Sequence, residues 1–319
     1  KYTGGSWLNI LVTGIGGDIG NAIGRILDKS DICDVVYGCD IHNQHGGRYV
    51  FKKCFLVPRV DRKNYIDCIY DLVKEYNIQI VIPSSEPEQR YLLNNGIVDQ
   101  VGSARLLLPN IYAMEIGFDK LKTARFLEKN NLPFPWTCEV GKQNPESVPC
   151  ILKSRSGAGS KDIKLVNKYS EIDLYEKLYS DCIWQEKVGS ESEEYTCGVY
   201  RSSNGETRVL ILRRRLSAGI TSYAELVDIK QITELCEDIA RLINLVGSIN
   251  IQLRLNGDIP VVFEINPRFS STVMFRHMAG FQDLIWSIHE MMFQKLPEYK
   301  LKYNSGMCLY KKCEEVVML

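Results

Sequence analysis

Several features that define common classes of protein are missing from this sequence of 319 residues. No apolar run approaches the ~20 residues that a membrane-spanning helix needs, and no signal peptide is recognisable. The 39 Lys and Arg residues balance the 39 Asp and Glu residues, so no net field attracts nucleic acid or an anionic membrane. The sequence therefore predicts a protein with no nucleic-acid partner and no membrane partner.

The cysteines and histidines also lack the spacing of known sites. None of the 11 cysteines forms a Cys-x-x-Cys pair, which is typical of a reduced, cytoplasmic protein rather than a disulfide scaffold. The four His residues have no partners at zinc-ligand spacing, and no Ser-His-Asp or Cys-His arrangement is recognisable. What the sequence does contain is 45% hydrophobic residues, enough for two or three domains with packed cores.

The first hundred residues alternate between predicted strands and helices. Apolar runs at 8–13, 35–39, 78–82 and 105–108 are typical of buried strands. Apolar residues at helical spacing follow the first run and recur at 65–76. Alternating strands and helices favour a parallel sheet with right-handed crossovers, so we predict a Rossmann-like domain.

A glycine turn joins the first strand to the first helix, and it has two interpretations. Gly14, Gly17 and Gly20 have the spacing found in sugar-nucleotide epimerases, and Asp40 stands where a ribose-binding acid would. Those enzymes also carry a Tyr-x-x-x-Lys pair far downstream, whereas here that pattern occurs only inside the first domain. We therefore expect the glycines to pack the helix on the strand. The alternative functions are an NAD-dependent sugar-nucleotide epimerase or reductase, and a nucleotide-binding module without turnover.

The stretch 261–271 brings polar side chains to the end of a predicted strand. Three β-forming residues lead to Glu264, and Asn266 follows two residues later, so the two side chains share one face. Carboxylate and amide oxygens are ligands that Mg²⁺ accepts while it takes others from nucleotide phosphates. Arg268 continues this face, and its planar guanidinium suits the same phosphates. The stretch therefore predicts a site for magnesium and a nucleotide.

Residues further upstream supply what such a nucleotide needs. A helix is predicted to begin at Asp119-Lys120, and a strand at 149–153 ends in Lys153 before a loop rich in Gly and Ser. Small loop residues let backbone amides close over phosphates. The predicted strand at 183–188 then offers backbone groups to a base, and Glu194 offers a carboxylate to ribose.

Three consecutive arginines end a predicted strand at 206–216. Because side chains alternate along a strand, Arg213 and Arg215 share one face and Arg214 takes the other. We expect at least one of them in solvent. The other face is a candidate for an anionic substrate or the transferred phosphoryl group.

In this order the motifs resemble the ATP-grasp superfamily over residues 119–271, and the first hundred residues resemble the domain that commonly precedes it. The resemblance implies that Lys120 and Lys153 hold ATP phosphates, that Glu194 binds ribose, and that two Mg²⁺ ions, or Mn²⁺ in their place, sit on two adjacent strands. Many ATP-grasp ligases carry Asp where this chain has Gln252. Gln there looks like the large subunit of carbamoyl phosphate synthase and its single-unit relatives. By resemblance the adenine hinge is Glu186, Lys187 and Val188; the phosphate loop includes Ser156, Gly157 and Gly159; and the metal ligands are Gln252, Glu264 and Asn266.

The resemblance also implies a fold and an activity. The fold is α/β, becoming α+β in the C-terminal part. It has a Rossmann-like domain at 1–112, a small lid subdomain at 113–184 and a C-terminal subdomain with the metal site at 185–319. The activity is ATP-dependent ligation, in which a substrate carboxylate becomes an acylphosphate that an amine or another nucleophile captures, with Lys153 and Arg268 as catalytic residues. The partners are then small molecules, and a homo-oligomer stays open.

Overall fold

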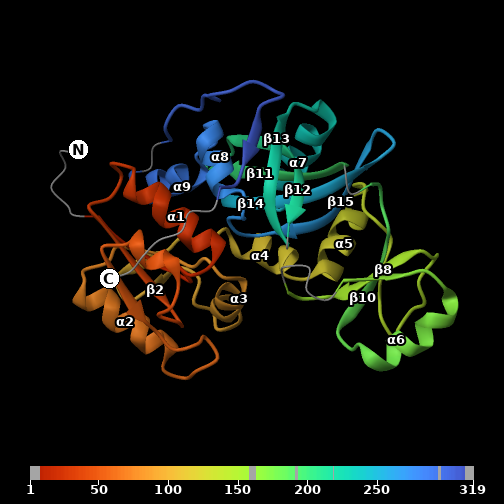
Figure 1. Cartoon of the computed structure of the whole chain (residues 1–319), viewed down its shortest axis with the longest axis horizontal. Helices are drawn as coiled ribbons and strands as arrows, with labels where there is room; N and C mark the ends of the chain where they lie inside the picture. The colour runs from red at the N-terminus through yellow and green to blue at the C-terminus, as the bar shows by residue number, and fades with distance from the viewer. Residues whose placement is uncertain (1–7, 158–162, 191–192, 218, 294–295, 313–319) are drawn as a thin grey trace. The chain divides into compact units, whose positions relative to one another are not determined.

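The structure is a computed structural model that describes residues 8–157, 163–190, 193–217, 219–293 and 296–312 (Figure 1). The chain divides into two compact units. The first unit contains the chain up to Ile111 together with Arg268–Lys302, and the second contains Tyr112–Pro267 together with Tyr303–Lys311. The predicted domain boundaries are finer than this division and stay predictions.

A six-stranded sheet forms the centre of the first unit. Its strands are β1 (Asn9–Thr13), β2 (Val35–Asp40), β3 (Lys53–Leu56), β4 (Ile80–Ile82), β5 (Gln100–Val101) and β6 (Ala104–Leu106), and its helices include α1 (Asp18–Asp28), α2 (Tyr65–Glu75) and α3 (Glu86–Asn94). The strand order is β3-β2-β1-β4-β6-β5, and all pairs are parallel except β5 with β6. Ile10, Leu11 and Val12 are completely buried, as expected for a strand covered on both faces. The predicted Rossmann-like sheet is confirmed.

The glycine turn packs α1 closely on this sheet. Gly14 has a φ of +61°, a value that favours glycine. A Cβ atom on Gly20 would meet the Gly14 carbonyl oxygen and would lie 2.9 Å from Ser84 Oγ. The packing interpretation therefore holds for these two glycines.

Two helices from the far end of the sequence complete the first unit. They are α8 (Val273–Ala279) and α9 (Asp283–Phe293). Val273 and Ile288 join Ile23 and Ile26 of α1 in one buried apolar cluster. The core of the first unit therefore depends on residues that follow the predicted metal site in sequence.

Two antiparallel sheets build the second unit. Its strands are β7 (Thr137–Glu139), β8 (Cys150–Ser154), β9 (Lys164–Val166), β10 (Cys182–Glu186), β11 (Glu194–Arg201), β12 (Thr207–Ser217), β13 (Ile220–Val227), β14 (Gly247–Asn256), β15 (Ile259–Asn266) and β16 (Cys308–Tyr310). Helices α4 (Ile111–Gly117), α5 (Lys120–Lys129), α6 (Ile172–Leu178) and α7 (Lys230–Leu242) accompany them. The small sheet has the order β7-β10-β8-β9, and the large sheet β15-β14-β11-β12-β13-β16.

The large sheet is held by an apolar stripe on α7. Ile232, Cys236 and Ile239 are completely buried and share a cluster with Ile251 of β14 and Ile265 of β15. The apolar residues of α7 recur at helical spacing in the sequence, as expected for a helix that covers a sheet. In the described part of the chain, no helix is both long and apolar enough to span a bilayer.

Candidate functional site

The two strands predicted to hold metal ions are neighbours in the large sheet. Gln252 of β14 pairs with Glu264 of β15, and Asn250 pairs with Asn266. Cross-strand partners share a face, and so do residues two apart on one strand. The three predicted ligands therefore lie on one face of the β14–β15 pair. The register shifts immediately after Gln252, an irregularity of the kind that often re-aims side chains at functional sites.

Lys120 reaches this face from the first residue of α5. Asp119 fixes the start of the helix, because its carboxylate accepts hydrogen bonds from two backbone N–H groups of the first turn at 3.0 and 3.2 Å. Lys120 Nζ lies 3.5 Å from Glu264 Oε1 and donates to the Gly157 carbonyl oxygen at 2.7 Å. The helix start, the glycine-rich loop and β15 therefore meet at one ammonium group.

Lys153 reaches the same face from β8 in the small sheet. Its side chain is buried, and Nζ makes a long hydrogen bond of 3.4 Å to the Phe263 carbonyl oxygen. Burial lowers the pKa of Lys153 to about 8, although the nearby Glu264 carboxylate opposes this shift. A buried ammonium with so weak a hydrogen bond gains from an anion placed beside it.

The sequence does not predict Arg155, which ties the glycine-rich loop to α5. Its guanidinium binds the Asp119 carboxylate, with Nη2 2.7 Å from Oδ2, and its backbone carbonyl accepts from Lys120 N at 3.1 Å. Burial would raise the pKa of Asp119, but hydrogen bonds from Arg155 and from the backbone hold it below its usual value. Arg155 therefore connects the two segments that present Lys120.

The glycine-rich loop follows β8 directly. Gly157 has a φ of +114°, and a Cβ atom there would meet nothing within 4 Å. Ser156 Oγ lies 3.4 Å from Asp181 Oδ2. The third predicted loop residue, Gly159, lies outside the described residues. The role of this loop in phosphate binding stays a prediction.

Glu194 holds two arginines that link it to the predicted metal site. Its Oε1 accepts from Arg214 Nη2 at 2.7 Å, and its Oε2 accepts from Arg254 Nη2 at 2.8 Å. Arg214 Nη2 also donates to Gln252 Oε1 at 2.9 Å. Each carboxylate oxygen also accepts from the Nε atom of the same arginine, at 3.0 Å for Arg214 and 3.2 Å for Arg254, so its two lone pairs are both used. The predicted ribose contact of Glu194 stays a prediction, and it would have to replace one of these bonds.

Among the three consecutive arginines, the one that points toward this site is Arg214. Arg213, on the opposite face of β12, pairs with Glu225 at 2.5 Å and its side chain is 45% exposed. Arg215 lies over the ring of Tyr223. The alternation predicted along the strand is confirmed. Of the three arginines, Arg214 lies on the face of β12 that carries Glu194 and Gln252.

The predicted adenine hinge follows the end of β10. Glu186 faces the chain before β7, because its Oε2 accepts from Trp136 N at 3.2 Å. Lys187 is exposed, Val188 is buried, and the Val188 carbonyl accepts from Arg254 Nη1 at 3.4 Å. Arg254 therefore connects the hinge with Glu194, and the adenine-binding role of the hinge stays a prediction.

Positive charge exceeds negative charge in this cluster. The carboxylates of Glu194 and Glu264 are outnumbered by four cationic side chains, all from the second unit: Lys120, Lys153, Arg214 and Arg254. Gln252 contributes no charge to this cluster, because its side chain is a neutral amide. A cluster with two surplus positive charges, much of it buried, favours a ligand with several negative charges, such as a triphosphate.

The predicted metal ligands offer one carboxylate and two amide oxygens, a set that suits Mg²⁺ better than softer ions. Among the described residues no group of three or more His, Cys, Asp or Glu could hold an ion. An ion here would therefore take further ligands from phosphates and water. Gln252 Oε1, which already accepts from Arg214, has one lone pair left for it. The residues fit a magnesium ion that is bound together with a nucleotide.

Arg268 belongs to the first unit, unlike the other predicted site residues. Its Nη2 lies 3.7 Å from Glu86 Oε2, and its Nη1 donates to the Phe269 carbonyl oxygen at 3.1 Å. Glu86 also pairs with Arg90 of the same helix. The predicted role of Arg268 toward phosphates stays a prediction.

Two family models match separate parts of the chain. Residues 190–309 match the one described as ATP-grasp in the biosynthetic pathway with Ter operon, and residues 10–98 match PylC-like, N-terminal domain. Over 52 residues the chain is 48% identical to the carbamoyl phosphate synthase large chain of Streptomyces griseus. That match covers 16% of this chain and 5% of the relative, so the chain spans a small part of the relative's length. The predicted resemblances to ATP-grasp proteins and to the large subunit of carbamoyl phosphate synthase are confirmed by these matches.

Solved structures show the same fold over most of the chain. N5-carboxyaminoimidazole synthetase from Staphylococcus aureus complexed with ADP is 17% identical, with a TM-score of 0.73 and coverage of 92% of this chain and 80% of that chain. Biotin carboxylase from Campylobacter jejuni in a β-γ-ATP complex is 13% identical, with a TM-score of 0.71 and coverage of 93% and 74%. The predicted fold, a Rossmann-like domain followed by an ATP-grasp domain, is confirmed.

Proposed function

We propose that this chain is an ATP-dependent ligase that joins a substrate carboxylate to an amine or another nucleophile. The match of residues 190–309 to an ATP-grasp family model and of residues 10–98 to a PylC-like N-terminal model supports the proposal. One observation carries the proposal. Lys120, Lys153 and Arg214 converge on the face formed by Gln252 and Glu264, and they bring more positive charge than the two nearby carboxylates balance. Such a site suits a nucleotide triphosphate.

The proposed reaction has two steps. A carboxylate oxygen of the substrate attacks the γ-phosphorus of ATP, the bond to the β–γ bridging oxygen breaks, and ADP leaves with that electron pair. The nucleophile then attacks the carbonyl carbon of the acylphosphate, inorganic phosphate leaves, and the nucleophile loses its proton to solvent or phosphate. Neither step needs a side-chain nucleophile, which agrees with the lack of a recognisable catalytic triad in the sequence.

The chain contributes mainly electrostatic stabilisation. Lys120 and Lys153 neutralise the charge on the transferred phosphoryl group, and their burial makes that interaction stronger than it would be in water. Glu264, Asn266 and Gln252 would hold Mg²⁺, which would offset the negative charge of the phosphates. Arg268 is proposed as a further phosphate ligand.

The rest of the site positions the nucleotide. Ser156, Gly157 and Gly159 are proposed to cover the phosphates, and the segment Glu186 to Val188 to present backbone groups to adenine. Glu194 is proposed to accept from ribose hydroxyls in place of part of its bonds to Arg214 and Arg254. Arg155 is a positioning residue, because it acts on the nucleotide through the start of α5.

ATP binding can be tested without knowing the carboxylate. In thermal unfolding, ATP with Mg²⁺ at a hundredfold excess over Kd should stabilise the parent protein by about 2.7 kcal/mol. Lys153→Met should be stabilised clearly less than the parent, and Lys300→Met, a change of an exposed lysine, should be stabilised as much as the parent. Equal stabilisation of the parent and Lys153→Met would contradict the assignment of the site.

Ligation can be tested by trapping the acylphosphate. With ATP, Mg²⁺ and a panel of carboxylic acids, hydroxylamine should capture the intermediate as a hydroxamate. ADP and hydroxamate should then form in equal amounts for the acid that fits. If a carboxylic acid accelerates ADP release but no hydroxamate forms, the protein would be a nucleotide hydrolase instead.

A further inference from the structure

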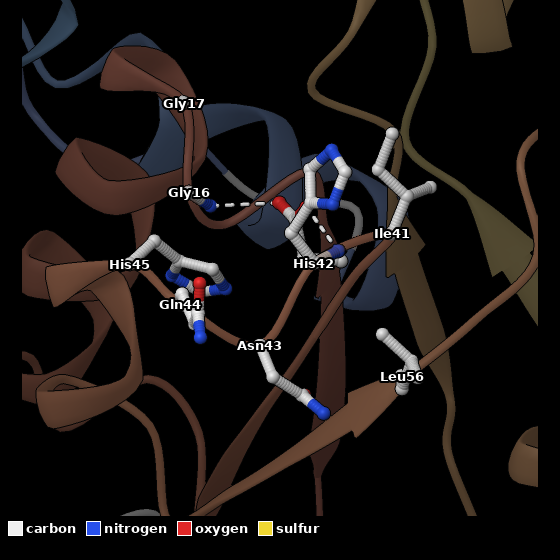
Figure 2. Close-up of a pocket in the computed structure, with 9 residues that line it drawn as sticks. Gly16, Gly17, Ile41, His42, Asn43, Gln44, His45 and Leu56 are labelled. Carbon is white, nitrogen blue, oxygen red and sulfur yellow. Dashed lines mark hydrogen bonds between the residues drawn. The ribbon is translucent and has the colours of Figure 1, made fainter.

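The first unit carries a hollow that the proposed function does not use, and Figure 2 shows its lining. Its volume is about 620 Å³, and it lies between the glycine turn that follows β1 and the loop that follows β2. Leu56, the last residue of β3, completes the lining. Open parallel sheets characteristically bind ligands outside the carboxyl ends of their strands. The hollow has that position in this sheet.

Asp40, the last residue of β2, supplies the charged group of the hollow. Its Oδ2 accepts from Gly16 N at 2.8 Å, and its Oδ1 accepts from His42 N at 3.1 Å. These two bonds fix the orientation of the carboxylate. Each oxygen keeps a second lone pair, so the group presents two adjacent acceptors. Two adjacent hydroxyl groups, such as those of a ribose, are the matching donors.

Gly16 belongs to the hollow rather than to the packing of α1. A Cβ atom on Gly16 would lie 3.0 Å from His45 Cγ and 3.2 Å from Asp40 Oδ2. A Cβ atom on Gly47 would meet the Ile15 carbonyl oxygen, so the loop after β2 packs directly on the glycine turn. The packing interpretation thus accounts for Gly14 and Gly20. The third predicted glycine, Gly17, lines the hollow together with Gly16, and a Cβ atom on it would lie 3.3 Å from the Gly14 carbonyl oxygen.

Ile41 and Leu56 form an apolar wall on one side of the hollow (Figure 2). Leu56 pairs in register with Asp40, and Ile41 follows Asp40 in sequence, so both flank the carboxylate. Their side chains are 37% and 57% exposed. Such a wall beside a diol acceptor suits a flat apolar group attached to a sugar, which describes a nucleoside base.

We propose that this hollow binds the ribonucleoside part of a ligand, with the ribose hydroxyls on Asp40 and the base against Ile41 and Leu56. The first unit would then hold a nucleoside site of its own, built from residues other than those proposed for ATP in the second unit. This proposal goes beyond the ligase function and does not rest on it. It stands or fails whatever reaction the second unit performs.

The test uses the full chain with Lys153→Met, which is designed to disable the ATP site. ADP and UDP are the probes, titrated in equilibrium binding experiments. At least one of them should bind, and adding Asp40→Asn should weaken that binding by about 10- to 100-fold, the effect of losing hydrogen bonds to a charged acceptor. The 2′,3′-dideoxy form of the same probe should bind to the protein that retains Asp40 as weakly as the unmodified probe binds to the variant with Asp40→Asn.

A second variant separates binding from folding, because Asp40 also holds two loops. Leu56→Asp changes an exposed wall residue that makes no such bonds, and it should also weaken the probe. Leu178→Asp, at a leucine on α6 that is 62% exposed, is the matched control and should leave binding unchanged. The proposal is overturned if neither probe binds to Lys153→Met, or if binding is indifferent to Asp40→Asn, to Leu56→Asp and to removal of the ribose hydroxyls.

Discussion

Each unit of this protein buries an ionisable group whose pKa moves toward neutrality. Burial raises the pKa of Glu88 in the first unit to about 7 and lowers that of Lys153 in the second unit to about 8. Their hydrogen bonds differ. Glu88 accepts from Thr13 Oγ1 and Tyr65 Oη, each at 2.5 Å, whereas Lys153 makes a long bond of 3.4 Å to a backbone carbonyl.

The comparison separates two uses of a buried charge. The carboxylate of Glu88 has its acceptors filled by its own unit, so it serves the fold. Lys153 is short of hydrogen-bond partners and faces a carboxylate, Glu264, with other cations nearby, so the site gains when a polyanion arrives. We propose Lys153 as a functional residue because it is short of hydrogen-bond partners, not because of the size of its pKa shift.

The largest expected effect is that of Glu264→Gln on ATP turnover. The change keeps the shape of the side chain but removes the one carboxylate among the three predicted metal ligands, so we expect a fall of about 10²- to 10³-fold in rate. The melting temperature of the protein without nucleotide should change little by comparison. ADP release at varied Mg²⁺, measured beside unfolding, checks this.

Glu234→Gln is the matched control for that experiment. Glu234 pairs with Lys230 on the exposed surface of α7, so neither rate nor stability should move. If Glu264→Gln loses activity only because the variant unfolds, β15 has a structural role and the predicted metal site is wrong.

Lys153→Met should stabilise the protein without nucleotide while it removes ATP binding in the second unit. A shift from the usual 10.5 to about 8 corresponds to a cost of up to about 3 kcal/mol for holding the charged amine at pH 7. Because the unfolded chain binds the proton more tightly, the stability of the parent rises with pH between about 8 and 10.5, and the advantage of the variant shrinks there. Urea unfolding at pH 7 and pH 10 measures both values, and a less stable variant at pH 7 would contradict the comparison.

Whereas Lys153→Met should stabilise the protein, Glu88→Gln should destabilise it. It leaves a buried hydroxyl of Thr13 or Tyr65 without an acceptor, which costs about 1–3 kcal/mol. Since the folded state raises the pKa of Glu88 from 4.5 to about 7, the parent loses stability as pH rises through that window. The variant should therefore be more destabilised at pH 5 than at pH 8, and a pH-independent difference would show that Glu88 does not titrate in this range.

Arg213→Ala should have the smallest effect. Its pair with Glu225 is partly exposed, so its loss should change stability by less than about 1 kcal/mol and leave ATP binding intact. Arg214→Ala, one residue further along the same strand, should impair both, because Arg214 is buried between Glu194 and Gln252. Equal effects of the two substitutions would mean that the face assignment of β12 is wrong.

Features that depend on local sequence were predictable. Apolar runs and helical stripes indicate the strands and α7, and the spacing of Glu264 and Asn266 places them on one face before any pairing is known. The sequence does not predict β3, because the strand has only four residues and none of them is fully buried. The apolar pattern therefore predicts the secondary structure of segments whose apolar residues are buried.

Features that depend on pairing between distant segments were not predictable. Arg254 resembles any polar strand residue until β11 and β14 pair, which brings it opposite Glu194. Arg155 meets Asp119 across 36 positions of sequence. The apolar wall of the hollow likewise needs β2 and β3 in register. These contacts follow from strand register and chain reversal, which a single sequence leaves open.

The central claim is that the surplus positive charge around Glu264 receives the phosphates of ATP. A crystal structure of the protein with ADP and Mg²⁺ tests it most directly. We expect the phosphates within hydrogen-bonding distance of Lys120 Nζ and Lys153 Nζ, with the ion on Glu264. ADP phosphates bound away from both lysines, while the second unit stays without nucleotide, would contradict the claim.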